Sequence, residues 1–237
     1  MKLPVEISPN PLVTSTIELR FFTQASSIDL FPVVYQAFSS LFPKFEVSNL
    51  PSDVKSGNPQ FKFTPDYMLS NENYRLSFSN TVLSFEHVSD YQFWRNYFPF
   101  VSSCYEKFFN LVKAEFIERI GVRYASVLDK TESANQVLVS VPGISLSGYN
   151  QKFEHYRSVI KVNGFNLLLQ IFDNARAQIK DHSISGVYID IDASFDQKIE
   201  PNKKALEIID QLHSEQKKLF FSLLKEDYIQ TLNPKYS

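Results

Sequence analysis

The chain has 237 residues and a formal net charge of −2, from 24 basic and 26 acidic residues. This length suffices for a sizeable core, and the near balance of charge argues against general nucleic-acid binding, which depends on a basic surplus. With 22 Phe, 12 Tyr, 6 Gly and a single cysteine, the composition predicts a core built from aromatic rings and excludes an internal disulfide and a cysteine-based zinc site.

The first elements are predicted to be a strand and a helix. Residues 12–22, LVTSTIELRFF, alternate in polarity and are rich in β-branched and aromatic side chains, which is typical of a strand. Apolar side chains then recur at helical spacing over 27–43. Ser27 or Asp29 is available as the cap of this helix, and Pro32 is placed in its first turn, where a missing N–H costs little.

Several short strands are expected next, interrupted by one polar loop. The segment 44–50 reads as a strand, and 51–60 is predicted to be a surface loop because Pro, Ser, Gly and Asn cluster there. Two or three further strands are predicted over 61–67, 74–80 and 81–88.

A long aromatic helix is predicted from Tyr91 onward, where the apolar period changes from two to that of a helix. Its stripe runs over 93–112 and includes Trp94 and Cys104. We interpret this stripe as core, with Cys104 a buried structural thiol. Asp90 is the expected cap.

The second half of the chain is predicted to contain more strands and a terminal helix. The expected strands are 116–128, 156–162, 166–173 and 185–196. The segment 173–185 is predicted to be a polar loop, and a single helix is expected from about residue 202 to 232.

This order of elements predicts an α+β protein in which curved antiparallel sheets grip long helices. The two halves, 8–115 and 116–237, repeat much of the same order and are consistent with a degenerate duplication of a strand-helix-strands-helix unit. No linker of low complexity separates them. We therefore expect residues 1–237 to form a single compact domain.

Three stretches together resemble a known family. NPLVTSTIELRF near the start, a tryptophan-bearing helix after SFEHVSDY, and IERIGVRYAS in mid-chain are similar to an uncharacterised, sporadically distributed prokaryotic family. Its members open with a "PLVE…FELRF"-like strand and carry an "RxGxRYxN"-like strand, although Ser126 stands here where the family often has Asn. The scattered distribution implies transfer on mobile elements, and with it a partner gene in an antiviral defence or toxin–antitoxin-like setting. The family has no established activity, so the resemblance implies no catalytic residue.

The stretch IERIGVRYAS carries the candidate binding site. With period two, Arg119, Gly121 and Arg123 lie on one strand face, about 13 Å separating the two arginines along the strand. Two guanidinium groups so placed could clamp carboxylates or phosphates, with Gly121 leaving room for a partner backbone or a packed ring. Tyr124 follows on the other face as a further binding residue.

An alternative for both arginines is internal pairing on neighbouring strands, for instance with Glu18 or Asp190. The sequence leaves the choice between a structural brace and a recognition face open. We expect the brace for Arg119 and recognition for Arg123.

A second candidate site lies in YIDID (188–192), which places Asp190 and Asp192 on one face. Two carboxylates at this spacing can hold Mg²⁺ in a phosphoryl-transfer site. Asp173 and Asp196 are near in sequence, but no third ligand is evident, and a solvated face or a pair for the arginines is the competing interpretation. The four histidines share no metal-binding spacing.

These patterns favour a non-enzymatic binding protein, and the resemblance implies a protein partner encoded nearby. The alternatives are a metal-dependent enzyme that acts on a phosphate-containing substrate through Asp190 and Asp192, and a helix-grip domain that binds a small ligand. The opening residues lack the pattern of a signal peptide, and no apolar stretch approaches the roughly 20 residues that span a bilayer. We therefore expect a cytoplasmic protein with no membrane partner and no cofactor, and the sequence leaves its oligomeric state open.

Overall fold

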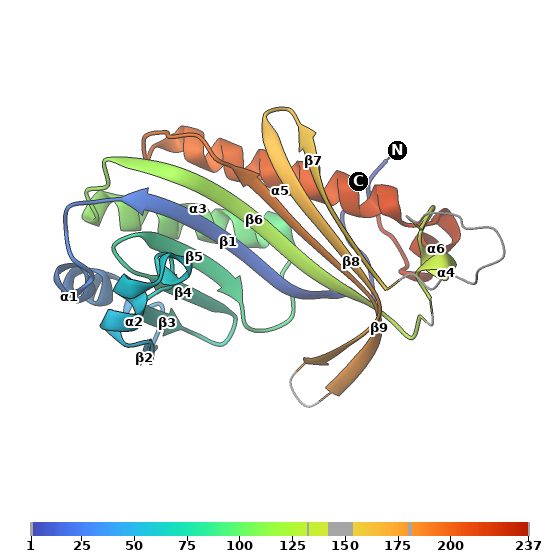
Figure 1. Cartoon of the computed structure of the whole chain (residues 1–237), viewed down its shortest axis with the longest axis horizontal. Coiled ribbons are helices and arrows are strands. Elements are labelled where there is room, and N and C mark those ends of the chain that lie inside the picture. Colours follow the sequence, from blue (N-terminus) through green and yellow to red (C-terminus); the bar gives the residue numbers. More distant parts are fainter. Residues whose placement is uncertain (1, 132, 142–153, 180–181, 237) are drawn as a thin grey trace. The chain divides into compact units, whose positions relative to one another are not determined.

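The computed structural model describes residues 2–131, 133–141, 154–179 and 182–236. The strands within these residues are β1 (Leu12–Phe22), β2 (Lys44–Val47), β3 (Tyr67–Ser70), β4 (Tyr74–Phe78), β5 (Val82–His87), β6 (Phe116–Asp129), β7 (His155–Val162), β8 (Phe165–Ile179) and β9 (His182–Phe195). They form one open nine-stranded sheet in the order β2-β3-β4-β5-β1-β6-β9-β8-β7 (Figure 1). The neighbouring pairs β2–β3, β3–β4, β4–β5, β5–β1 and β8–β7 are antiparallel.

The protein thus combines helices with an open sheet, and the predicted α+β class is confirmed. The helices are α1 (Ser27–Phe38), α2 (Ser52–Gly57), α3 (Trp94–Leu111), α4 (Ala134–Val137), α5 (Lys203–Leu223) and α6 (Glu226–Thr231), with a 3₁₀ turn at Pro59–Phe61. None of the described helices is long and apolar enough to cross a lipid bilayer.

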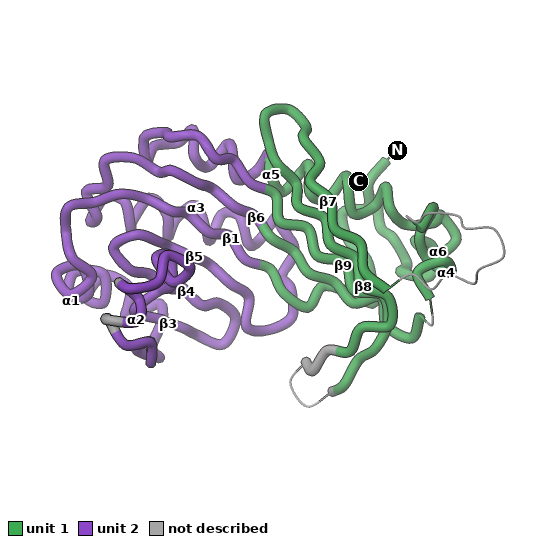
Figure 2. Tube along the Cα trace, in the orientation of Figure 1, with its two compact units in different colours: residues 1–15, 123–193, 212–237 green, residues 16–122, 194–211 purple. Residues whose placement is uncertain are grey.

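The chain divides into two compact units, each assembled from separated segments (Figure 2). Unit 1 comprises residues 1–15, 123–193 and 212–237, and unit 2 comprises residues 16–122 and 194–211. Their boundaries fall inside β1, β6, β9 and α5, because each of these long elements contributes residues to both units. The division therefore interleaves along the chain, whereas the suggested halves 8–115 and 116–237 are contiguous.

The core of unit 2 is built from aromatic rings. Phe21 of β1 meets Phe108 and Phe109 of α3 edge-on, with ring centroids 5.8 and 5.4 Å apart. Phe78 of β4 lies 6.0 Å from Phe108. Cys104 is buried in the same helix face, as predicted. Edge-to-face ring pairs of this kind add to the burial of apolar area, so α3 is fixed to the sheet of unit 2 by its aromatic stripe.

The start of α3 differs from the sequence prediction. The helix begins at Trp94, and its N-cap is Phe93 with φ 58° rather than Asp90. Trp94 is half-buried, and its indole Nε1 donates to Asp210 Oδ1 at 2.7 Å. The placement of Trp94 in the core was therefore wrong, since a polar partner holds the indole at the edge of the packed stripe.

The first helix agrees with the prediction in position but not in its cap or its end. Ser26 caps α1, and its side chain accepts from the Asp29 N–H. The helix ends at Phe38 rather than at residue 43. Pro32 lies in the second turn, beyond the first-turn position that tolerates proline best.

Two segments that were predicted to be polar loops are ordered elements. Residues 51–60 contain α2 and most of the 3₁₀ turn. Residues 173–179 belong to β8 and residues 182–185 to β9, which are neighbouring strands of the sheet. Composition gave the wrong result because hydrogen bonding between two strands satisfies a polar backbone as well as water does. Residues 61–66 likewise lie outside β3, and the single predicted terminal helix is divided into α5 and α6.

The core of unit 1 lies between β9 and the end of α5. Val187, Ile189 and Ile191 are buried in one cluster with Phe220 and Leu224. Tyr188 and Asp190 alternate with these residues and so point to the opposite face of the sheet. In Figure 1, no described helix lies over that opposite face at β7–β9.

Candidate functional site

Strand β6 carries the two arginines that the sequence analysis singled out. Its bounds, Phe116–Asp129, agree with the prediction, and Ile120, Val122 and Tyr124 are buried on one face. Arg119 lies in the part of β6 that belongs to unit 2, and Arg123 in the part that belongs to unit 1. The two arginines are therefore surrounded by residues of different units.

Arg119 is held between two carboxylates of unit 2. Its Nη1 donates to Glu18 Oε1 at 3.1 Å, and its Nε lies 3.4 Å from Asp196 Oδ1. Glu18 is shared with Arg20, whose Nε donates to the same Oε1 at 2.7 Å. The side chain of Arg119 is only 16% exposed. This arrangement is the internal brace that the sequence offered as the alternative to a binding role.

Gly121 makes room for the Arg119 side chain rather than for a partner. A Cβ atom added at Gly121 would lie 2.4 Å from Arg119 Nη1 and 3.0 Å from its Cζ. Both distances are shorter than van der Waals contact, so the guanidinium occupies the space above the glycine. The expectation that Gly121 leaves room for a partner backbone or ring was therefore wrong, because its own neighbour fills that space.

Arg123 makes a two-point pair with Asp190 of β9. Its Nε donates to Oδ1 at 2.9 Å and its Nη2 to Oδ2 at 2.7 Å. The carboxylate is 4% exposed, whereas the arginine side chain is 51% exposed. The hydrogen bond with Asp190 raises the pKa of Arg123 above its ordinary value. The guanidinium is thus fixed by a buried anion while about half of it faces solvent.

Gln170 and Tyr188 of unit 1 neighbour this pair, and further aromatic rings lie beside Tyr188. Gln170 Nε2 lies 3.5 Å from Asp190 Oδ2. The ring of Phe172 is 5.8 Å from that of Tyr188 and stacks on His155 at 4.1 Å. Burial, and next the charge of Asp190, raise the pKa of the Tyr188 hydroxyl.

We call the sheet face that carries these residues the open face of unit 1. Sequence reasoning did not find the contributions of β7 and β8 to it. The dipeptide Asn163-Gly164 was the available signal, because it closes a two-residue hairpin with φ 51° and 82° and so fixes which residues of β7 and β8 face each other.

Tyr124 does not belong to the open face. It is 7% exposed, and its ring lies 5.5 Å from that of His213 on α5. The alternation of β6 had already placed it opposite Arg123. Among the residues proposed for binding, Arg123 is the one that reaches solvent on unit 1.

The carboxylates proposed as metal ligands are used in other ways. Both oxygens of Asp190 accept hydrogen bonds from Arg123, and Asp192 is half-buried on the same face of β9. Asp173 accepts from the Ala134 N–H at 2.9 Å, and Asp196 lies against Arg119. Among the described residues, no three His, Cys, Asp or Glu side chains are placed to share a metal ion.

The described histidines with shifted pKa values are shielded from solvent. Burial lowers the pKa of His87 to about 4. Burial, and next the charge of Lys217, lower that of His213 to about 3. Both imidazoles are therefore neutral near pH 7, and each packs against tyrosine rings, His87 on Tyr97 and His213 on Tyr124.

Unit 2 contains a separate hollow of about 690 Å³. Its wall includes Ser26 and Ile28 at the start of α1, together with Val47 and Tyr67. Both lysines on this wall have an anionic partner: Lys55 Nζ lies 2.7 Å from Asp66 Oδ1, and Lys62 Nζ lies 3.6 Å from Glu118 Oε1. The hollow lies beside α1 and α2, not between the sheet and a long helix as a helix-grip ligand site would.

Comparisons with protein-family models, with curated proteins and with solved structures find no match for this chain. The resemblance of its motifs to a prokaryotic family therefore stays a prediction.

Proposed function

We propose that this chain is a non-enzymatic protein-binding module that recognises its partner on the open face of unit 1. The observation that carries the proposal is the Arg123–Asp190 pair. A guanidinium that is half exposed and already held in place by a buried carboxylate loses little side-chain freedom when it binds.

The chemistry of this pair suits recognition of a carboxylate or a carbonyl on another protein. Asp190 takes one N–H from Nε and one from Nη2, and about half of the Arg123 side chain stays exposed to a partner. Arginine is among the residues that most often dominate binding energy in protein interfaces. The aromatic rings of Phe172 and Tyr188 provide the apolar contact that accompanies such an arginine.

The identity of the partner follows from the resemblance described above and is part of the proposal. A sporadic family carried on mobile elements implies a functional counterpart encoded beside it, as in defence or toxin–antitoxin-like operons. We therefore propose that the product of an adjacent gene is the protein that Arg123 contacts.

The test is co-expression of the chain with the product of each adjacent gene, followed by size-exclusion chromatography and titration calorimetry. The informative variant is the double substitution Arg123→Gln with Asp190→Asn, because it removes both charges and leaves no buried carboxylate behind. We expect it to weaken the complex by about tenfold or more and to keep the fold.

A matched control is available in unit 2. Arg75 of β4 and Glu86 of β5 form a similar cross-strand pair with 3.5 Å between Nη1 and Oε2, and the Arg75 side chain is 38% exposed. The double variant Arg75→Gln with Glu86→Gln should leave the affinity unchanged. Equal affinities for both double variants and the unmodified chain, or the absence of a complex with every adjacent gene product, would reject the proposal.

A further inference from the structure

Strand β7 ends the sheet on the side of unit 1. It pairs with β8 over its full length, from His155 opposite Phe172 to Val162 opposite Phe165, and β8 is its single neighbour among the described strands. No other described strand pairs with the second side of this eight-residue strand, which presents an edge of backbone donors and acceptors.

The register shows which backbone groups face outward. The Asp173 N–H donates to the Glu154 carbonyl at 3.0 Å, and the same parity continues to the Val162–Phe165 pair that closes the hairpin. In an antiparallel pair, alternate residues exchange both of their hydrogen bonds with the neighbour, and the residues between them direct both groups away. The outward-facing residues are therefore His155, Arg157, Val159 and Lys161.

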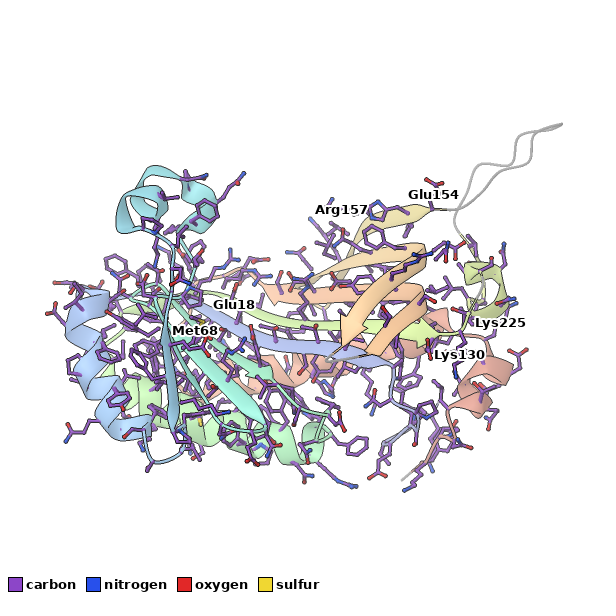
Figure 3. The ribbon with its side chains drawn as sticks, turned by 90° about the horizontal axis from the view of Figure 1, so that it is seen from below. Glu18, Met68, Lys130, Glu154, Arg157 and Lys225 are labelled. Atoms are coloured by element: carbon purple, nitrogen blue, oxygen red, sulfur yellow. The ribbon has the colours of Figure 1, made fainter. Side chains whose placement is uncertain are left out.

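The side chains of these four residues share one chemical character. All four are exposed on the open face of unit 1, and three of them carry a basic group. In Figure 3, Arg157 lies on this outer strand with Glu154 just before its start. The residues of β7 that alternate with these four point to the other face of the sheet. Two of them, Tyr156 and Ile160, are partly buried against the core of unit 1.

An added strand would therefore meet two different environments on its two faces. On the open face it would lie beside Arg157 and Lys161, where an acidic side chain forms a favourable cross-strand pair. On the other face it would lie beside Tyr156 and Ile160, where an apolar side chain extends the core.

We propose that β7 is a docking edge for an extended segment of a partner protein in which acidic and apolar side chains alternate. The inference rests on the proposed function and adds the chemistry of the partner. A second copy of this chain is a poorer occupant, because antiparallel pairing of two β7 strands brings the basic side chains of the two copies together, and like charges in cross-strand positions are destabilising.

The probe is an acetylated, amidated and fluorescently labelled octapeptide that alternates glutamate and valine. The reference is the same peptide with lysine in place of glutamate. Binding is measured by fluorescence anisotropy with the full chain. We expect the glutamate peptide to bind and the lysine peptide to bind at least about tenfold more weakly, with an affinity for the glutamate peptide that falls as salt is added.

Two variants test the edge itself. Val159→Pro removes an outward N–H that takes no part in the pairing with β8, which is the position where an edge strand tolerates proline. It should weaken binding of the glutamate peptide at least about tenfold. The double variant Arg157→Glu with Lys161→Glu changes no backbone group and should reverse the preference between the two peptides.

The other edge of the sheet supplies the control. The Ser48 N–H donates to the Asp66 carbonyl at 2.8 Å, so the parity of the β2–β3 register directs the Val47 N–H outward from β2. Val47→Pro therefore removes an equivalent outward donor in unit 2 and should not change peptide binding. Thermal unfolding of each variant checks that the fold is kept, and if Val159→Pro does not fold, the charge-reversal variant decides whether the edge binds the peptide.

Several results would overturn the inference. They are equal binding of the two peptides, binding that is unaffected by both β7 variants, and self-association of the chain that Val159→Pro abolishes. If an adjacent gene product binds the unmodified chain and the β7 variants equally, the proposed function stands and this inference fails. Charge-selective peptide binding without a complex with any adjacent gene product would instead support the edge and reject the proposed partner.

Discussion

Arg119 and Arg123 lie four residues apart on the same face of one strand, yet different groups hold them. In unit 2, Arg119 is mostly buried between Glu18 and Asp196, whose side chains are 26% and 45% exposed. In unit 1, Arg123 is half exposed, and its partner Asp190 is almost fully buried. Arg119, the more buried of the two arginines, thus has the more exposed carboxylate partners.

This contrast shows that the exposure of an arginine does not by itself measure how much the fold depends on it. A carboxylate that is partly in water can lose its arginine and be solvated again, whereas a buried carboxylate left alone keeps the full cost of desolvation. The pair in unit 1 should therefore be the more sensitive one, although its arginine reaches solvent and is the proposed contact for a partner.

The largest expected effect is that of Arg123→Ala. It leaves the Asp190 carboxylate buried without its two N–H donors, and we expect it to lower the free energy of unfolding by about 3–5 kcal/mol. Urea denaturation monitored by circular dichroism measures this value. The control is Arg123→Ala combined with Asp190→Asn, which removes the buried charge and should recover part of the loss. A loss below about 1 kcal/mol in the single variant would place Arg123 with ordinary surface arginines.

Arg119→Ala is expected to lower the free energy of unfolding by less, about 1–2 kcal/mol. Glu18 keeps its hydrogen bond from Arg20 after the substitution, and Asp196 keeps one from the Ser194 hydroxyl at 2.8 Å. The same denaturation experiment applies. If Arg119→Ala proved more damaging than Arg123→Ala, the comparison between the two sites would be reversed, and partner burial would not be the deciding quantity.

The smallest expected effect is that of Gly121→Ala, which should lower the free energy of unfolding by less than about 1 kcal/mol. The atoms that a new Cβ would meet are the end of the Arg119 side chain, which can move aside without a change in the backbone. Because the cost arises from displacing that side chain, Gly121→Ala and Arg119→Ala should be non-additive in a double-mutant cycle. Strict additivity would show that Gly121 is needed for a reason other than the space it leaves to Arg119.

The sequence was sufficient for features that depend on alternation within one segment. The period of two in β6 and β9 placed Arg119, Arg123 and Asp190 on their faces, and the internal pairs with Glu18 and Asp190 that it suggested are present. The sequence did not reveal which member of each ion pair, the arginine or the carboxylate, is the more exposed. Burial depends on what the neighbouring strands and helices cover.

Other features depended on contacts between distant segments and were missed. Trp94 lies at helical spacing with core residues, but Asp210, far along the chain, bonds its indole at the surface. The polar composition of 173–185 is typical of a loop, yet most of it forms paired strands. Gly121 gave no local indication that the arginine two residues before it would lie over it. In each case a tertiary partner overrode a local pattern.

The rate at which the Cys104 thiol reacts can report how often the aromatic core around α3 opens. The Cys104 side chain is 2% exposed, and burial raises its pKa to about 12, so the native molecule presents almost no thiolate to a reagent. Because the sequence contains no other cysteine, every alkylation event records an excursion in which α3 separates from the rings of Phe21 and Phe78. The rate of labelling, followed as denaturant is added, would thus give the free energy of that opening without any engineered probe.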